Sequence, residues 1–287
     1  MDNLMQVQDM PNHGAVPPEE IARVAEQLAI DKAKKRHEVT VVLAIMAGMF
    51  IAIAGMFYSV VMAGAQSMPY GMSKLVGGIV FSIGLMLVVL CGAELFTSST
   101  LLLIGKATGK LKFHNIVKNW VVVYVGNFIG SILFVLLIIG GGVWENGNGQ
   151  VGLSSMYIAK AKLGHPFFQV LILGILCNLL VCLCYWMTLS ARTAAGKMMA
   201  CILPVAAFIT AGFEHSVANM YLLPMGYMIK SLAGPEFWQA VGYTAADFDI
   251  INLTSIFMNL LPVTIGYIIG GGVMVGLSNW FVFLRVK

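Results

Sequence analysis

The chain has 287 residues, of which 59% are hydrophobic and only 10% are charged, and its formal net charge is +4. Soluble globular domains carry about 25% charged residues. The composition therefore excludes an ordinary soluble protein and predicts one that is integral to a membrane.

The first 38 residues are polar and mixed in charge, with no apolar core followed by a small-residue cleavage site, so we expect no cleavable signal peptide. Pro17, Pro18, Glu19 and Glu20 resemble the start of a helix, which predicts a short amphipathic helix over about 18–36. This helix either caps a pore or lies at the membrane surface. The basic cluster 32–37 at its end is read either as a membrane anchor or as a pH-sensitive gate.

Apolar segments fill the rest of the chain. Each is longer than the ~20 residues that cross the hydrocarbon core of a bilayer. The six segments are 39–66, 73–105, 116–143, 167–190, 198–230 and 253–284. We therefore predict an all-α protein with six membrane spans, preceded by an N-terminal segment 1–38, with the membrane domain over 39–287.

The basic residues divide unevenly between the two sides of these spans. Of the 17 Lys and Arg, 13 fall on the side that holds both termini and 4 on the other. The positive-inside rule then predicts that both termini are cytoplasmic.

Two related motifs place ionisable groups inside apolar spans. Gly92-Ala93-Glu94 lies in the second span and Gly212-Phe213-Glu214-His215 in the fifth, 120 residues later. Ionisable side chains are costly in a bilayer and usually line an interior path. Because the two spans cross in opposite senses, we predict an inverted repeat, about 39–143 and 167–284, in which spans two and five are broken helices.

Glycine patterns in spans three and six support a repeat. Gly126-x-x-x-Gly130 corresponds to Gly266-x-x-x-Gly270, and the segment 138–143 recurs in sequence as 268–273. Small residues at this spacing let helices approach closely in lipid.

The breaks also predict a local chemistry. Thr97 or Ser98 is expected to cap the half-helix after the first break, and Ser216 the one after the second. Half-helix N-termini favour anions, and histidine titrates near physiological pH. Glu94 and Glu214 are expected to support the breaks by bonding to loop backbone.

No metal or other cofactor is predicted, because His215 is the only histidine in an apolar span. The five cysteines lie in apolar spans without metal or redox spacing, which favours packing.

Several long motifs resemble the formate/nitrite transporter family, most closely its formate channels. The resemblance runs from about residue 18 to the C-terminus. The motifs are Met68-Pro69-Tyr70-Gly71-Met72-Ser73-Lys74-Leu75-Val76-Gly77-Gly78, Gly92-Ala93-Glu94-Leu95-Phe96-Thr97-Ser98, Gly212-Phe213-Glu214-His215-Ser216-Val217-Ala218-Asn219-Met220 and Asn259-Leu260-Leu261-Pro262-Val263-Thr264-Ile265-Gly266.

The resemblance implies an aquaporin-like fold, a homopentamer in a bacterial inner membrane and one pore for each protomer. It implies that Thr97 and His215 are central to the substrate pathway, with Lys162 in a vestibule and Asn178 on span four. Apolar constrictions fall on Phe81, Leu85 and Phe208, with Leu95 and Phe96 close by.

One position departs from the family pattern, which usually has Asn after the glycine that corresponds to Gly266. Here that residue is Tyr267, whereas Asn127 is kept in span three. The phenol either faces the pore or packs against a neighbouring protomer.

The function predicted from these features is a channel for formate, in which Lys162 attracts the anion, Thr97 donates a hydrogen bond and His215 supplies or shares a proton. Nitrite or hydrosulfide channels on the same scaffold are the alternative. Water and glycerol channels are disfavoured because paired Asn-Pro-Ala motifs are absent, and ammonia channels or haem-bearing subunits because paired intramembrane histidines are absent. No nucleic-acid partner is expected.

Overall fold

The computed structural model describes residues 14–285, and within that range every regular element is helical. Residues 1–13 of the predicted N-terminal segment lie outside the described part. The longer elements are α1 (Pro18–Lys34), α2 (His37–Met62), α3 (Tyr70–Leu90), α4 (Phe96–Ser99), α5 (Leu103–Ala107), α6 (Phe113–Gly140), α7 (Gln150–Leu163), α8 (Phe167–Ser190), α9 (Ala194–Thr210), α10 (Ser216–Leu232), α11 (Pro235–Val241) and α12 (Leu253–Tyr267). The short segments are η1 (Ala65–Ser67), η2 (Thr100–Leu102), η3 (Val143–Glu145), η4 (Ala245–Phe248) and the π-helical η5 (Ile268–Leu277) and η6 (Trp280–Leu284), which continue α12.

The six predicted spans are all present. Helices α2, α6 and α8 and the continuous segment α12–η6 are unbroken, while spans two and five are each divided into two parts. Within residues 14–285, five helical stretches are long and apolar enough to cross a membrane, and α9 is a shorter apolar helix. Helices α7 and α11 were not predicted, because neither has the length or the hydropathy of a span.

Both breaks have the same backbone geometry. Gly92 and Gly212 adopt left-handed φ angles of 68° and 75°, which a residue without a Cβ reaches at little cost. The next N–H groups turn back to the preceding helix: Ala93 donates to the Val88 carbonyl at 3.0 Å and Phe213 to the Phe208 carbonyl at 2.9 Å. This is a Schellman ending for α3 and for α9.

Close glycine contacts confirm one of the two predicted correspondences in spans three and six. A Cβ on Gly130 would lie 2.0 Å from the Ile45 carbonyl oxygen, so α6 packs directly on α2. A Cβ on Gly270 would lie 2.2 Å from the Ile175 oxygen, so the last span packs on α8 in the same way.

The correspondence of 138–143 with 268–273 is wrong. Gly140 ends α6 and a Cβ there would meet nothing within 4 Å, whereas Gly271 lies inside the last span against Asn178. Glycine-rich sequence is common in membrane helices, so this similarity does not reflect an equivalent position.

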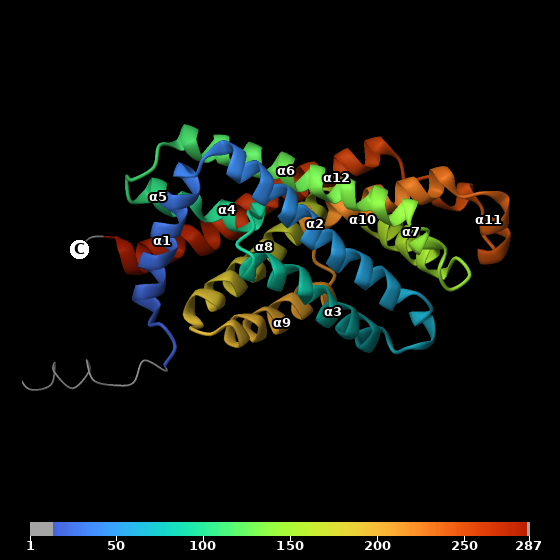
Figure 1. The fold of residues 1–287 in the computed structure, drawn as a ribbon, viewed down its shortest axis with the longest axis horizontal. Coiled ribbons are helices and arrows are strands. Elements are labelled where there is room, and N and C mark those ends of the chain that lie inside the picture. Colours follow the sequence, from blue (N-terminus) through green and yellow to red (C-terminus); the bar gives the residue numbers. More distant parts are fainter. Residues whose placement is uncertain (1–13, 286–287) are drawn as a thin grey trace, which may run out of the picture.

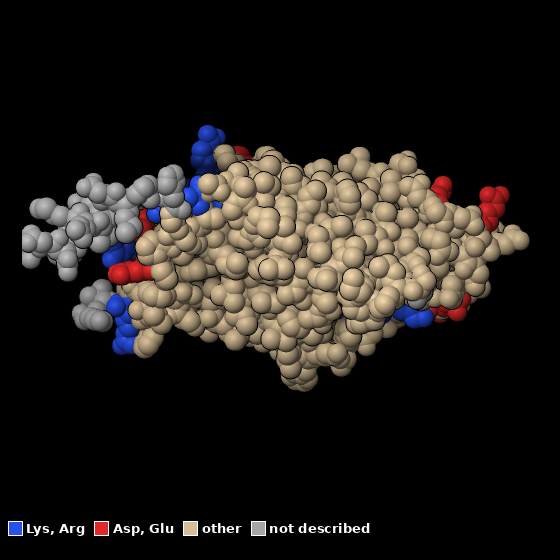
Figure 2. All heavy atoms as spheres, turned by 90° about the horizontal axis from the view of Figure 1, so that it is seen from below, with Lys and Arg blue, Asp and Glu red and all other residues tan. Residues whose placement is uncertain are grey.

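The spans form an elongated bundle. In Figure 1, α2 and α6 run side by side, α3 lies beside α9, and α1 crosses one end. Lys and Arg gather at the end where α1 lies, and acidic residues gather at the opposite end (Figure 2). We call these the basic end (α1 and the first turns of α2 and α6) and the distal end (α7 and α11).

The contact between α2 and α6 gives a first prediction. Gly130→Ala forces the Ile45 carbonyl away, because no backbone tolerates a 2.0 Å contact. Overpacking of this kind costs about 1–3 kcal/mol, so the thermal unfolding midpoint in detergent falls. Gly140→Ala, in the same helix but in open space, is the matched control. Equal midpoints for the two variants would contradict the close packing.

Candidate functional site

The first break is held by a single side chain on α6. The Asn127 amide oxygen accepts the Phe96 N–H at 2.9 Å, and its amide nitrogen donates to the carbonyls of Glu94 at 2.9 Å and Ala44 at 2.8 Å. Asn127 is completely buried. One residue thus pairs two backbone groups that the break leaves open, the Phe96 N–H and the Glu94 carbonyl, and also ties the break to α2 through Ala44; unwound backbone at membrane depth requires such partners.

His215 caps the second break, and the caps predicted from sequence are wrong. The residue before α10 is His215, whose Nδ1 accepts the Ala218 N–H at 3.0 Å. The residue before α4 is Leu95, and the Ser98 hydroxyl donates to its carbonyl at 3.1 Å instead of capping the helix. Neither Thr97 nor Ser216 caps because each lies inside its half-helix.

This cap fixes the hydrogen-bonding state of the imidazole. Because Nδ1 accepts a hydrogen bond, the neutral ring carries its proton on Nε2, which is then a donor. The Thr97 Oγ1 atom is buried and has no hydrogen-bond partner among residues 14–285. The half-helix N–H groups of Phe96 and Ala218 are already paired, and the side chains of Thr97 and His215 add two donors close to the breaks.

A cavity of about 310 Å³ opens at the basic end, between α1 and the first break. The Glu94 carboxylate on its wall accepts from the Nζ atoms of Lys32 and Lys35, each at 2.6 Å. Burial, the largest single effect, would lower the pKa of Lys32, but the Glu94 carboxylate and Tyr185 together outweigh burial and raise that pKa above its usual value. Lys32 therefore stays charged at neutral pH.

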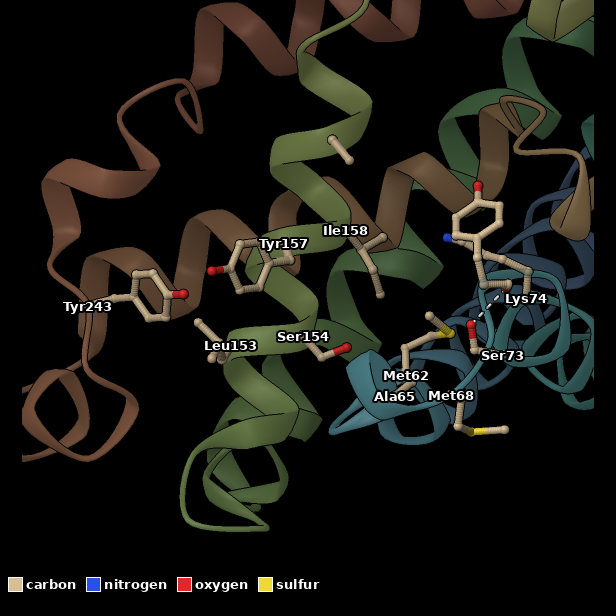
Figure 3. Close-up of a pocket in the computed structure, with 12 residues that line it drawn as sticks. Met62, Ala65, Met68, Ser73, Lys74, Leu153, Ser154, Tyr157, Ile158 and Tyr243 are labelled. Atoms are coloured by element: carbon tan, nitrogen blue, oxygen red, sulfur yellow. Dashed lines mark hydrogen bonds between the residues drawn. The ribbon is translucent and has the colours of Figure 1, made fainter.

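A second cavity, of about 270 Å³, opens from the distal end and reaches His215. On its wall, Lys162 donates to one Glu214 oxygen at 3.1 Å, and Asn219 donates to the other at 2.6 Å. This vestibule shares Lys74 with an outer cavity of about 500 Å³ beside α7 (Figure 3).

The cavity at the basic end and the cavity at the distal end, which we call the basic and the distal vestibule, have equivalent positions in the two repeats. The inverted repeat therefore extends beyond the predicted spans. Lys32 and Lys162 each lie five residues before an unbroken span, α2 and α8. Asn119 donates to the Lys32 carbonyl at 3.5 Å, and Asn259 donates to the Lys162 carbonyl at 3.1 Å. Helices α1 and α7 therefore belong to the repeat. The common spacing of the lysines is the sequence signal for this pairing, and it was missed.

The contacts of Glu94 and Glu214 are different from the predicted ones. Both were expected to bond to loop backbone, but their carboxylates bind lysines from α1 and α7. They thereby fasten those helices to the breaks. Lys162, predicted to attract the anion, is neutralised by Glu214.

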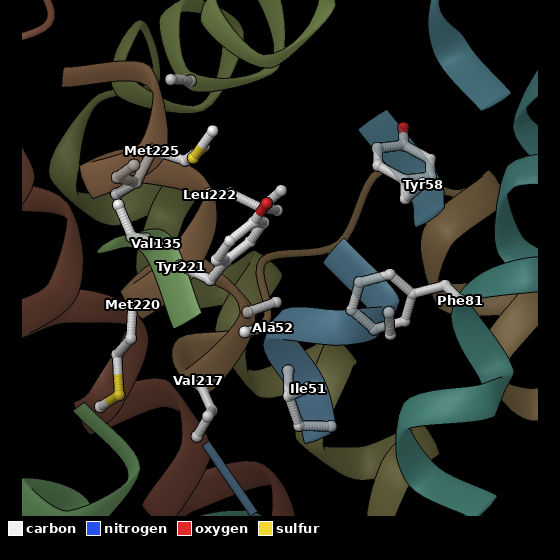
Figure 4. Packing of buried hydrophobic residues seen from close by; sticks show 14 of the residues in the cluster. Ile51, Ala52, Tyr58, Phe81, Val135, Val217, Met220, Tyr221, Leu222 and Met225 are labelled. Carbon is white, nitrogen blue, oxygen red and sulfur yellow. The ribbon is translucent and has the colours of Figure 1, made fainter. Parts of the chain in front are cut away.

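Apolar rings lie around His215, between the vestibules. Its ring centroid is 5.5 Å from Phe208 and 6.3 Å from Phe81, and those two rings are 6.0 Å apart. Figure 4 shows Phe81 projecting from α3 toward the buried face of α2. Leu85 and Leu95 are buried in the same core. Phe96 belongs to this core as well, and its ring packs against Tyr124 on α6, with the centroids 5.1 Å apart.

Asn178 ties the two halves together. Its amide nitrogen donates to the Tyr267 carbonyl at 2.7 Å and to the Thr100 hydroxyl at 3.2 Å, and Thr100 in turn donates to the Thr97 carbonyl at 2.7 Å. Its donors are thus engaged with protein, which favours a positioning role.

Tyr267 faces the interior, with a side chain that is completely buried. Its ring lies 5.4 Å from the His215 ring, edge to face, and its hydroxyl lies 3.2 Å from Cys177 Sγ. The phenol therefore lies inside the protomer, and not on a surface that could contact a neighbouring protomer. It packs against the residue that caps the second break.

This architecture agrees with comparisons to known proteins. Residues 19–281 match the profile of the formate/nitrite transporter family. The formate channel FocA of Escherichia coli (strain K12) is 48% identical over 269 residues, covering 93% of this chain and 94% of that protein. FocA of Haemophilus influenzae is 41% identical over 265 residues, covering 91% and 93%.

Solved structures show the same fold. One, described as a pentameric formate channel with formate bound, superposes with a TM-score of 0.84 at 48% identity and covers 88% of this chain and 99% of its own. An ion channel of the same family superposes with a TM-score of 0.76 at 27% identity. The protein belongs to the formate/nitrite transporter family, as the sequence motifs indicated, and is a multi-pass membrane protein of the transporter class.

The contact between Glu94 and α1 gives a second prediction. Glu94→Gln leaves Lys32 and Lys35 without their carboxylate, so α1 loosens by roughly 1–3 kcal/mol, a figure discounted because Lys35 is 30% exposed. Amide hydrogen exchange within α1 reports this loosening. Glu19→Gln, which removes an exposed pair with Arg23, is the control and changes little. Unchanged exchange in Glu94→Gln would show that the pair does not hold α1.

Proposed function

We propose that this protein is a formate channel, in which each protomer conducts the anion along a path from the distal vestibule, past His215 and Thr97, to the basic vestibule. The names of its relatives support formate as the substrate. The observation that carries the proposal is the pair of free donors, Thr97 Oγ1 and His215 Nε2, in an otherwise apolar stretch between two cation-lined cavities.

The apolar stretch explains why a weak acid is a suitable substrate. Moving an isolated carboxylate past the rings of Phe81 and Phe208 is costly, while the neutral acid crosses far more easily. Formate is small and has a single carboxylate, so one proton removes its charge. The substrate passes the rings as formic acid or as a proton-shared pair.

His215 has two tasks that compete. Neutral His215 offers its Nε2–H to the anion while Nδ1 holds the Ala218 N–H. To deliver a proton, the ring must first be protonated on both nitrogens, which releases Ala218. Loss of a helix cap costs about 1 kcal/mol, so protonation of His215 is linked to the geometry of the second break.

The assembly and orientation extend the same proposal. The pentameric structure of a relative supports a homopentamer with one pathway in each protomer. The excess of Lys and Arg at the basic end supports a cytoplasmic position for that end and for both termini, in a bacterial inner membrane.

Formate flux into proteoliposomes, measured across pH, tests the two central residues. His215→Asn keeps a side-chain acceptor for the Ala218 N–H, since Asn is a good cap, but it cannot carry a proton. We expect that the formate flux of this variant no longer shows the pH dependence of the wild-type flux. Thr97→Val removes only a hydroxyl, and we expect roughly 10-fold lower flux, the usual worth of a hydrogen bond to a charged group.

The pH profile decides the role of His215. A wild-type profile in His215→Asn would exclude proton delivery by this residue. Competition among formate, nitrite and hydrosulfide in the same assay separates formate from the alternative anions, and stronger inhibition by nitrite or hydrosulfide than by formate would overturn the substrate assignment.

A further inference from the structure

The distal vestibule contains one lysine whose charge is not neutralised. Lys162 and Lys74 both line it, but only Lys162 has a carboxylate partner, Glu214. Lys74 makes no ion pair within residues 14–285. Its Nζ donates to the Tyr58 hydroxyl at 2.9 Å and lies 5.7 and 5.8 Å from the ring centroids of Tyr58 and Tyr70. The net positive charge of this vestibule therefore resides on Lys74.

Lys74 also lies at the point where two cavities meet. It lines the outer cavity of about 500 Å³ and the inner vestibule of about 270 Å³ that reaches His215. Figure 3 shows it at one side of the outer cavity, with Tyr157 and Tyr243 across from it. An anion that moves from the outer cavity toward His215 passes this ammonium group.

The contacts of Lys74 leave free donors for a carboxylate. An ammonium has three N–H donors, and the bond to Tyr58 uses one. The Tyr58 oxygen accepts that bond, so its own O–H remains a donor. The two donor atoms are 2.9 Å apart, and Tyr58 is only 5% exposed. This spacing suits the two oxygens of one small carboxylate.

Tyr58 also connects the site to the centre of the pathway. Its ring lies 6.3 Å from Phe81, whose ring lies 6.3 Å from His215. A carboxylate held by Lys74 and Tyr58 thus waits directly before the apolar rings.

The opposite vestibule has a corresponding lysine. Lys197, in the first turn of α9, lines the basic cavity and makes no ion pair among the described residues. Lys74 is in the second turn of α3, the equivalent helix of the other repeat. Each vestibule therefore combines a neutralised lysine near the break with an unneutralised one in the first two turns of the first half of the broken span.

We propose that Lys74, together with the Tyr58 hydroxyl, is a site that recruits and holds a small carboxylate at the distal vestibule. The inference rests on the proposed channel function and assigns its first binding step. Lys74 supplies the attraction, Tyr58 supplies the second hydrogen bond, and the Lys162–Glu214 pair fastens α7.

The test is formate flux in oriented proteoliposomes, with formate supplied at the distal face. Lys74→Met removes the single unneutralised charge of the distal vestibule. We expect KM for formate to rise about 10-fold, which is the lower end of the effect of electrostatic focusing in a charged cleft. The maximal rate at saturating formate stays within roughly a factor of two, because the later steps of transport are unchanged. Lys74→Arg keeps the charge and retains most of the affinity. Tyr58→Phe raises KM by a smaller factor.

Lys160→Met is the matched control, since Lys160 is at the same end but lines neither cavity. We expect a wild-type KM for it. A wild-type KM in Lys74→Met, or an equal rise in Lys160→Met, would overturn the assignment of Lys74. Absence of formate flux in the wild-type protein would instead overturn the proposed function. A lower maximal rate with unchanged KM would show that Lys74 acts only on the structure.

Discussion

The rest of the structure depends on one constraint: peptide groups freed by two helix breaks inside the membrane must find partners without water. The first break is satisfied by Asn127 and the second by the imidazole of His215. Asn127 comes from a position that close glycine packing fixes, because α6 approaches α2 at Gly130, whereas His215 lies in the second break itself, directly before α10. Without that close packing, the Asn127 side chain would not reach the first break.

The two repeats use the same backbone but different side chains, and this asymmetry gives the protein its chemistry. In the first repeat Asn127 is an inert amide that pairs three backbone groups. In the second, Tyr267 occupies the equivalent position and packs against His215, so a titratable ring performs the capping. The two breaks meet through Thr264, which contacts both Ser216 and Tyr124, and Tyr124 packs on Phe96. A chain of direct contacts thus connects Ser216, the residue after His215, to the first break.

Much of the fold was predictable because it is local. Span bounds follow from runs of apolar residues, and the predicted segment 167–190 coincides with α8. The breaks follow from Gly92 and Gly212, which must adopt positive φ. The partners of polar groups were not predictable, because they depend on distant contacts: Lys32 reaches Glu94, 62 residues away, and the cap of α10 is a histidine where a serine follows immediately. The repeated glycines at 140–142 and 270–272 led to a wrong correspondence between spans three and six. They are similar in sequence, but a short similarity does not show that two segments occupy equivalent positions in the bundle.

Charge is arranged so that each vestibule attracts an anion without retaining it. A conduction path needs sites that bind well enough to fill and weakly enough to empty. Glu214 neutralises Lys162 and Glu94 offsets Lys32 and Lys35, so the lysines nearest the breaks hold α7 and α1 in place instead of trapping substrate. The unneutralised charges lie farther out, at Lys74 and Lys197, beside cavities open to water. On the path that we propose, an anion meets its strongest attraction at these two lysines and only hydrogen bonds at the centre. Since the rings of Phe81 and Phe208 reject the charge itself, the channel function that we propose requires one further step between the two vestibules, the removal of that charge, and we assign this step to His215.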